Sequence, residues 1–545
     1  MSDAAREGSG AAQGTREASA AETSPASADT EPGPAGQAQP GPSARSGWLP
    51  QPGWFARLAR RHGLFGVALA GATALRIVVM LGYPPAIWFH DSYSYEQSAV
   101  AHYLSSARPG GYPIFMMILE PLHSFALVTL LQHLMGLGIG VAVYAVLRRR
   151  GLSGWLATLL ALPVLYDAYQ VQLEQMIMSD VLFMVLVVVA LVLLCWSDKP
   201  GWITAAVAGV LIGYATLVRS DGLPMLALVI VCLLLRRAGW RPLVALIVAG
   251  LVPIAGYVIA FHSETGQFAM TDSDGVFLYG RVSSFANCAQ IKPPASLADL
   301  CDHRPVGQRP IAVEYIWDKN PLYKIAHNGN IFSYQVNRQA KQFAEKAIEA
   351  QPLSYLAVVA HDTSRAFFWN RTLSYDRVTN SYYVFSKHPP YIASWRPWQD
   401  LRTYQPSIGQ TRAVEPFAGF LIGYQKVVYF RGVLLGLVLL LGLGGVLMRW
   451  RRWGGVMLLP WLLAMMLLVF PIATSGFSYR YELSVVPVAC IAAGLALTAR
   501  KRSGTASEEG HVAEPDAAAE PDGSGRGWPA KVGRQLRRRR PVEQE

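Results

Sequence analysis

Long apolar runs recur along most of this chain and constrain its fold more than any other feature. The stretches 181–195 and 432–448 carry almost no polar side chain. With their flanks they reach about 18–20 residues, the length of a membrane-spanning helix. Of all residues, 52% are hydrophobic and only 15% are charged, whereas soluble domains are about 25% charged. The runs exclude a soluble enzyme, and their recurrence excludes a single-pass anchor.

We therefore predict an all-α polytopic membrane protein with about ten transmembrane helices. A seven-span module covers 63–261, a large hydrophilic segment covers 262–425 between the seventh and eighth spans, and three final spans cover 426–499. The ten expected spans are 63–83, 124–147, 153–170, 181–197, 202–218, 222–235, 242–261, 426–448, 454–474 and 481–499.

The two ends of the chain have compositions that cannot form a core. Residues 1–47 contain no Val, Ile, Leu, Phe, Tyr or Trp, so we expect 1–50 to be a disordered tail rather than a signal peptide. The other tail, 503–545, is similar and ends in an arginine run. We expect that run to lie on anionic lipid or in solvent, and we assign no nucleic-acid partner.

The distribution of Lys and Arg predicts the orientation of the spans. If the amino terminus is cytoplasmic, the inner flanks hold 16 of these residues, whereas the short outer loops hold only Arg108, Arg219 and Arg480. This bias predicts a cell-membrane protein with both termini in the cytoplasm. The outer face then carries the loops 84–123 and 166–180 and the segment 262–425.

Two of the five cysteines lie in the hydrophilic segment. They are Cys288 and Cys301, and an extracytoplasmic location permits a disulfide between them. The other three lie in apolar runs, where a cysteine behaves as a small hydrophobic residue.

The first outer loop holds a carboxylate that suits base catalysis. Asp91 follows the aromatic pair Trp88 and Phe89 directly after the first span. A partly desolvated carboxylate at the membrane surface is tuned to act as a general base. The residues alone leave open a second interpretation, in which Asp91 is a solvated loop residue or a helix cap.

Two arginines lie on the outer face against the general charge bias. Arg219 closes the fifth span and Arg480 precedes the last one. Guanidinium groups bind phosphate in a bidentate manner, so both residues are candidates to hold a phosphate. Structural ion pairs with Asp221 and Glu482 are the alternative.

Three further acids occur in the second outer loop, namely Asp167, Glu174 and Asp180. Acids near membrane depth are usually functional. Together with Asp91 they offer oxygen ligands for a divalent cation such as Mg²⁺ or Mn²⁺, or they are interfacial residues in water. No motif requires a cofactor. Arg76, inside the first span, either extends to the interface or pairs with a buried acid.

Several short motifs occur in a characteristic order within the spans and on their flanks. They are Asp91-Ser92-Tyr93, Arg108-Pro109-Gly110-Gly111-Tyr112-Pro113, Leu131-Gln132-His133-Leu134, Arg148-Arg149-Arg150, Ser179-Asp180-Val181-Leu182-Phe183, Arg219-Ser220-Asp221-Gly222-Leu223 and Tyr479-Arg480-Tyr481. Their order and spacing resemble the integral-membrane glycosyltransferases of the GT-C type, in particular the protein O-mannosyltransferase-like family 39 group. The resemblance extends over about 63–260 and, more loosely, 426–499.

This resemblance implies a sugar donor linked to polyprenyl phosphate and chemistry on the outer face. Asp91 matches the catalytic acid of the family's first loop, which deprotonates the acceptor hydroxyl and inverts the anomeric centre. Arg219 and Arg480 become candidates for the donor phosphate, and Asp180 matches a position where relatives carry Glu or Asp. Many relatives have two adjacent acids in the first loop, whereas this chain has Ser92 after Asp91, which weakens the case for a metal.

The sequence leaves the sugar and the acceptor open. The segment 262–425 matches no known module, and the acceptor is a cell-envelope glycan, a glycolipid or a protein. A transporter or lipid flippase is the main alternative. It favours broken spans, inverted repeats and polar residues at mid-bilayer, whereas no convincing repeat is present and the polar residues cluster at the outer edge. A scaffold that presents 262–425 is a third possibility, but it leaves Asp91, Arg219 and Arg480 without a role.

Overall fold

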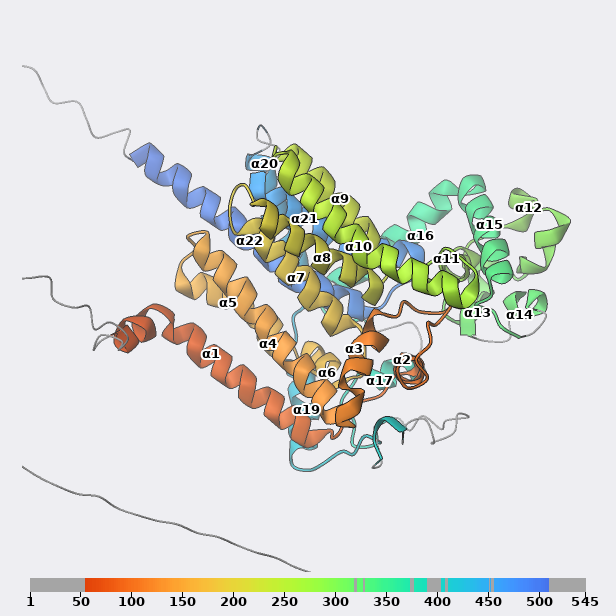
Figure 1. Cartoon of the computed structure of the whole chain (residues 1–545), viewed down its shortest axis with the longest axis horizontal. Helices are drawn as coiled ribbons and strands as arrows, with labels where there is room; N and C mark the ends of the chain where they lie inside the picture. The colour runs from red at the N-terminus through yellow and green to blue at the C-terminus, as the bar shows by residue number, and fades with distance from the viewer. Residues whose placement is uncertain are drawn as a thin grey trace, which may run out of the picture. The chain divides into compact units, whose positions relative to one another are not determined.

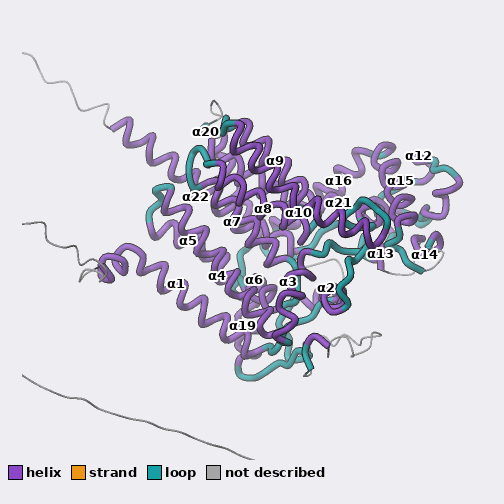
Figure 2. The backbone as a smooth tube through the Cα atoms, viewed as in Figure 1, coloured by secondary structure: helices purple, strands orange, loops and turns teal. Residues whose placement is uncertain are grey.

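The computed structural model describes residues 54–317, 321–326, 329–372, 377–389, 403–406, 410–449, 451 and 455–508. These residues are helical (Figures 1 and 2), and their only β-type pairing is an isolated bridge between Ile87 and Met176. The predicted tail 1–50 lies outside the described residues. So does the predicted tail 503–545, except that helix α22 continues to Glu508.

The apolar runs form helices where the sequence predicts them. Among the described residues, five helices are long and apolar enough to span a membrane, and the count becomes six if the pair α19–α20, bent by 55°, is one span. The bounds are α1 (Trp54–Gly82), α4 (Phe125–Arg149), α10 (Trp240–Thr265), α19 (Phe417–Val427), α20 (Gly432–Met448), α21 (Leu458–Thr474) and α22 (Tyr479–Glu508).

Four of the ten expected spans are short helices. They are α5 (Gly154–Tyr166), α7 (Asp180–Cys195), α8 (Trp202–Val218) and α9 (Gly222–Leu235). With 13 to 17 residues each, they extend about 20–26 Å at a rise of 1.5 Å per residue, less than a bilayer core of about 30 Å. The molecule is a multi-pass helical membrane protein, and the count of ten spans stays a prediction.

The third expected span, 153–170, was placed too long. Helix α5 ends at Tyr166, and Asp167 begins a separate helix, α6 (Ala168–Gln175). The carboxylate of Asp167 accepts hydrogen bonds from the backbone N–H groups of Tyr169 and Gln170, which makes it an N-cap. Every residue of α6 is buried, so a buried helix forms the middle of the predicted loop 166–180. That this stretch lies on the outer face stays a prediction.

Small residues allow α8 and α10 to pack closely. A Cβ atom on Gly213 of α8 would lie 2.3 Å from the backbone oxygen of Gly250 on α10, and one on Gly209 would lie 2.4 Å from the oxygen of Leu246. Such small-residue contacts are typical of packing between membrane helices, where backbones approach without intervening side chains. This pairing fixes the end of α8, from which Arg219 extends.

Arginines of two predicted inner loops meet at a third predicted inner loop, at one end of the helices. Arg150 lies 2.6 Å from the carboxylate of Asp198, and Arg236 donates to the backbone oxygen of Asp198. Since α7 runs from Asp180 to this end, Asp180 lies at the opposite end. Whether the basic end faces the cytoplasm stays a prediction.

The expected segment 262–425 divides into two parts. Its first part has a core of its own, built on Tyr279, Tyr315 and Phe343, and Figure 1 shows its helices gathered together. In the second part, Tyr383 and Tyr404 join the core of the long helices instead. Bounds here are α11 (Asp274–Ser283), α12 (Cys288–Ile291), α13 (Glu314–Trp317), α14 (Pro321–Ile325), α15 (Tyr334–Ala350), α16 (Pro352–Ser364) and α17 (Arg377–Tyr382).

A disulfide crosses the first part. Cys288, at the start of α12, is joined to Cys301, with 6.1 Å between the Cα atoms. The other three cysteines, Cys195, Cys232 and Cys490, are free and buried.

Candidate functional site

Asp91 lies in the first turn of helix α2 (His90–Val100). Its side chain is paired with Arg108, whose Nη2 donates to Oδ1 of Asp91 at 2.6 Å. Asp91 is only 8% exposed, so this carboxylate is largely removed from water but still reachable. The pair joins two parts of the first outer loop, since α2 and α3 (Gly111–Leu119) flank the stretch that carries Arg108.

Arg480 connects this pair to a second carboxylate. Its Nη1 lies 3.7 Å from Oδ2 of Asp91 and 3.3 Å from Oδ2 of Asp180. Asp180 is fully buried, and its Oδ1 lies 2.5 Å from Nη1 of Arg219. Arg219 also contacts Asp221 at 3.1 Å. We call these six residues the arginine–aspartate cluster: Asp91, Arg108, Asp180, Arg219, Asp221 and Arg480.

The cluster unites residues that are far apart in sequence. The sequence places Asp91, Arg219 and Arg480 on the same predicted outer face, and the structure brings them together with Asp180. Two guanidinium groups meet on the carboxylate of Asp180, which is a geometry that also suits a phosphate. Burial lowers the pKa of Arg219, but the carboxylates of Asp180 and Asp221 outweigh burial and raise it, so this side chain stays cationic.

Aromatic rings surround the two guanidinium groups. Arg480 lies 5.3 Å from the ring of Phe89, and Arg219 lies 5.2 Å from the ring of Tyr481. Rings at this distance attract a cation and shield it from water. The Nε of Arg480 is buried without a hydrogen-bond partner among the described residues, which leaves one N–H donor available to a ligand oxygen.

Glu174 does not belong to this cluster. It is fully buried and receives two contacts of 2.8 Å from Arg76, and His133 lies 2.9 Å away. Of the two interpretations of Arg76, the structure shows the pair with a buried acid. A Cβ on Gly136 would lie 1.9 Å from Oε1 of Glu174, so glycine at that position admits the carboxylate.

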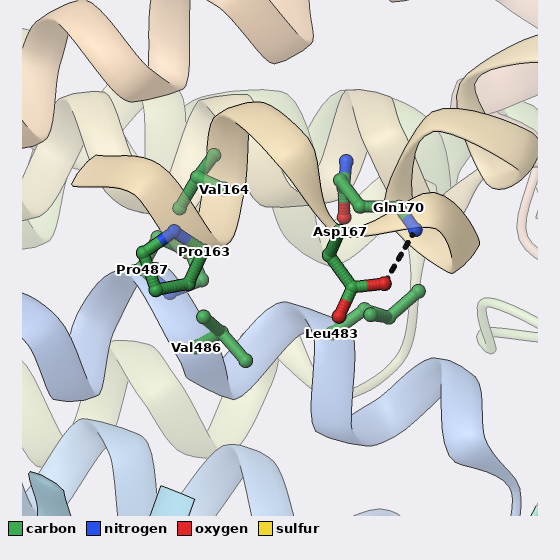
Figure 3. A pocket seen from close by; sticks show the side chains of 7 residues that line it. All are labelled: Pro163, Val164, Asp167, Gln170, Leu483, Val486 and Pro487. Carbon is green, nitrogen blue, oxygen red and sulfur yellow. Dashed lines mark hydrogen bonds between the residues drawn. The ribbon is translucent and has the colours of Figure 1, made fainter. Parts of the chain in front are cut away.

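Asp167 lies in a third place, beside Arg371. Nη2 of Arg371 lies 2.9 Å from Oδ2 of Asp167, and the backbone N–H of Phe430 donates to the same oxygen. Figure 3 shows Asp167 and Gln170 at a small pocket between α5 and α22, whose other walls are apolar. The structural role of Asp167 is therefore to join α6 to the chain around residues 371 and 430.

The four candidate acids thus lie in three separate places, each against an arginine. Asp91 and Asp180 are in the cluster, whereas Glu174 and Asp167 have their own partners. Within the described ranges, no group of three or more His, Cys, Asp or Glu side chains gathers around one point. These residues do not form a joint cation site, so the divalent cation stays a prediction and no step below uses it.

Comparisons with known proteins give matches only among solved structures. No protein-family model matches the chain, and no curated protein sequence matches it. The matching structures are GT-C glycosyltransferases, the group that the motifs resemble. The chain is similar to the S. cerevisiae protein O-mannosyltransferase Pmt1-Pmt2 complex bound to the sugar donor, with 15% identity and a TM-score of 0.32 over 42% of this chain and 38% of that one.

Two further structures cover more of the chain. The Archaeoglobus fulgidus oligosaccharyltransferase is 11% identical with a TM-score of 0.40, over 86% of this chain and 54% of that one. ArnT from Cupriavidus metallidurans, bound to undecaprenyl phosphate, is 13% identical with a TM-score of 0.33, over 82% and 79%. The chain spans about half the length of the archaeal protein and 38% of the length of the yeast one. The function argued below rests on this chain's own residues.

Sequence reasoning did not assign a role to Arg108. It was counted with Arg219 and Arg480 as one of the three cations in short outer loops, and the other two became candidate site residues. The position of Arg108 in a predicted outer loop, against the general charge bias, was the signal in the sequence that could have marked it as a candidate site residue. The structure shows Arg108 as the nearest charged partner of Asp91.

Proposed function

We propose that this protein is a membrane glycosyltransferase that moves a sugar from a polyprenyl-phosphate carrier to an extracytoplasmic acceptor. The observation that carries the proposal is the arginine–aspartate cluster. It places the carboxylate of Asp91 3.7 Å from Arg480, while Arg480 and Arg219 share Asp180. A base and a pair of phosphate-binding groups thus lie side by side at one end of apolar helices.

In the proposed reaction, Asp91 accepts the proton of an acceptor hydroxyl. That oxygen forms a bond to the anomeric carbon as the bond between this carbon and the phosphate oxygen breaks. The carrier leaves as polyprenyl phosphate, and direct displacement inverts the anomeric configuration. Arg108 holds Oδ1 of Asp91, which leaves Oδ2 on the side of Arg480 to receive the proton.

Arg480 and Arg219 bind the donor phosphate in this proposal. Negative charge grows on the leaving phosphate during the displacement, and preorganised cations stabilise it most in a desolvated site. The unpartnered Nε of Arg480 supplies a donor. The polyprenyl chain lies among the apolar helices, and the cluster faces the outside of the cell membrane, with both termini in the cytoplasm.

The first experiment is the release of polyprenyl phosphate from a panel of polyprenyl-phosphate sugars, with purified wild-type protein and a crude envelope fraction as acceptor. Loss of a general base lowers the rate by about 10²–10⁴-fold, so we expect Asp91→Asn to release almost none. Asp198→Asn is the matched control, because Asp198 lies at the other end of the helices and its side chain is 81% exposed.

Release by the wild type and by Asp198→Asn alone supports the proposal and identifies the sugar. Equal release by Asp91→Asn removes Asp91 as the base but keeps the transferase. If folded wild-type protein releases polyprenyl phosphate from none of the donors, the proposal fails and a transporter of the cell envelope becomes the better interpretation.

A further inference from the structure

A short helix of the large segment lies against the cluster on two sides. The ring of Trp317, the last residue of α13, is 5.8 Å from the guanidinium carbon of Arg108. Ala312, just before α13, lies 3.6 Å from the position of a Cβ on Gly476, four residues before Arg480. Helix α13 therefore connects the loop that carries Arg108 with the loop that leads to Arg480.

The core of the segment fixes the direction of this helix. Tyr315 and Ile316 are almost completely buried in that core, and the hydroxyl of Tyr315 donates to the carboxylate of Asp302. Trp317 is the next residue, and it is 46% exposed. Its ring rests on Phe332, with 5.4 Å between the centroids. The buried residues Tyr315 and Ile316 thus hold the aromatic side chain of Trp317 at the surface.

We propose that Trp317 is the acceptor platform of the transferase and that the acceptor is a carbohydrate. This inference rests on the proposed function and names its acceptor class. The face of an indole ring carries negative potential, and one face of a pyranose ring presents polarised C–H bonds, so the two stack. Arg108 lies 5.8 Å from Trp317 and 2.6 Å from Asp91. A sugar stacked on Trp317 would therefore lie beside the arginine that holds the base.

Arg108 adds polarity to this platform. A guanidinium group has five N–H donors in a plane, and the bond to Asp91 uses Nη2. The remaining donors suit the hydroxyl groups at the edge of a stacked sugar. An exposed aromatic face beside a hydrogen-bonding edge matches a sugar ring, which has an apolar face and a polar rim.

A polypeptide is the competing acceptor. Extended peptides are commonly held by main-chain hydrogen bonds at an exposed strand edge or in an apolar groove. The described residues contain no strand that would offer such an edge, whereas Trp317 presents a half-exposed indole beside Arg108. The carbohydrate is therefore the acceptor that this surface favours.

The test measures acceptor saturation separately from donor cleavage. Full-length protein in lipid nanodiscs receives a radiolabelled donor and increasing amounts of the envelope fraction. We expect Trp317→Ala to raise the half-saturating amount of envelope by roughly tenfold, the effect of losing about 1.4 kcal/mol of stacking. Trp317→Phe keeps a ring and is expected to stay within about threefold of the wild type, and Trp369→Ala, an exposed tryptophan elsewhere, is the control.

The acceptor class is tested in the same assay. Envelope oxidised with periodate, which cleaves sugar diols, is expected to lose acceptor activity, whereas protease-digested envelope keeps it. The reverse result shows a polypeptide acceptor and overturns the inference, as does an unchanged half-saturation for Trp317→Ala. Absence of donor cleavage by the wild type would instead mark failure of the proposed function.

Discussion

Asp180 is the residue through which the two candidate phosphate-binding arginines are held together. It is fully buried, and Arg219 and Arg480 approach its two different oxygens. This buried carboxylate compensates one of the two positive charges, and the carboxylates of Asp91 and Asp221 beside the arginines add to the compensation. The arginines are thus preorganised, so little ordering is needed when a phosphate arrives.

Substitution of Arg219 is expected to weaken donor binding. Charge-assisted hydrogen bonds contribute about 1.5–3 kcal/mol, so we expect Arg219→Ala to raise the donor KM by roughly 10- to 100-fold. Arg219→Lys keeps the charge but lacks the planar guanidinium group, so its donor KM is expected to lie between those of the wild type and Arg219→Ala. Binding of polyprenyl phosphate itself, measured by competition with the donor, checks this expectation, and an affinity equal to that of the wild type would contradict a phosphate role.

Glu174 is expected to matter for stability and not for chemistry. Glu174→Gln leaves Arg76 buried without its counter-charge, and loss of one partner of a buried ion pair costs about 3–5 kcal/mol. We expect a clearly lower unfolding temperature in nanodiscs, with normal transfer per folded molecule. Normal stability combined with lost transfer would be the opposite result and would assign Glu174 to the mechanism.

How far these residues could be predicted depends on where their partners lie. Asp91, Arg219 and Arg480 share one face in the topology that the charge bias predicts, so the sequence could indicate that they lie at the same end of the helices. Asp167 and Glu174 were predicted to share a cation site with Asp91 because the sequence shows only their positions along the chain and not their partners in space. The partner of Asp167 is Arg371, which lies in a segment whose apolar pattern is too irregular to show that it folds inward.

At the scale of the elements, the apolar runs predict the helices well because their length and composition act locally. The break at Asp167 was missed because length and composition do not show where a helix is interrupted. Its cap is a hydrogen-bond arrangement, and the apolar character continues through Pro163 and Val164 on one side and Leu173 on the other. A polar N-cap residue inside an apolar stretch was the signal available in the sequence.

The packing of α8 on α10 predicts a sharp difference between two glycines. A Cβ on Gly213 meets the backbone of Gly250 at 2.3 Å, whereas one on Gly256 of α10 has no atom within 4 Å. We expect Gly213→Ala to lower the unfolding temperature and the transfer rate, because α8 must move and Arg219 follows it. Gly256→Ala is expected to be neutral or slightly stabilising. Thermal unfolding of the two variants decides the matter, and equal behaviour would contradict the close pairing.

On the scale of the whole molecule, the first part of the large segment has its own core and still reaches the cluster through α13. In the proposed mechanism, donor chemistry and acceptor recognition are therefore carried by different parts of one chain. The helices supply Asp91, Arg219 and Arg480, and the segment supplies Trp317. The sequence could not show this division, because α13 is only four residues long and has no periodicity of its own.

The disulfide gives a way to perturb one part without the other. Cys288 and Cys301 are separated by 13 residues, and closing a loop of about 15 residues contributes about 3 kcal/mol in the chain-entropy model. We expect the double variant Cys288→Ser, Cys301→Ser to lose hydrogen-exchange protection in α11 and α15 and to saturate with envelope less readily. Donor hydrolysis without acceptor should persist. Unchanged protection in both helices would show that the disulfide does not stabilise this core.

The distance between Asp91 and Arg480 along the chain also has a consequence for biosynthesis. About 390 residues separate them, and a ribosome adds roughly 5–20 residues per second. For about 20 to 80 seconds after Asp91 is added, a nascent chain thus lacks Arg480 and the final helix α22. During this interval the buried carboxylate of Asp180 lacks one of its two arginine partners. Under the proposed function, we therefore expect a nascent or truncated chain to be inert toward lipid-linked sugars until translation reaches the final span.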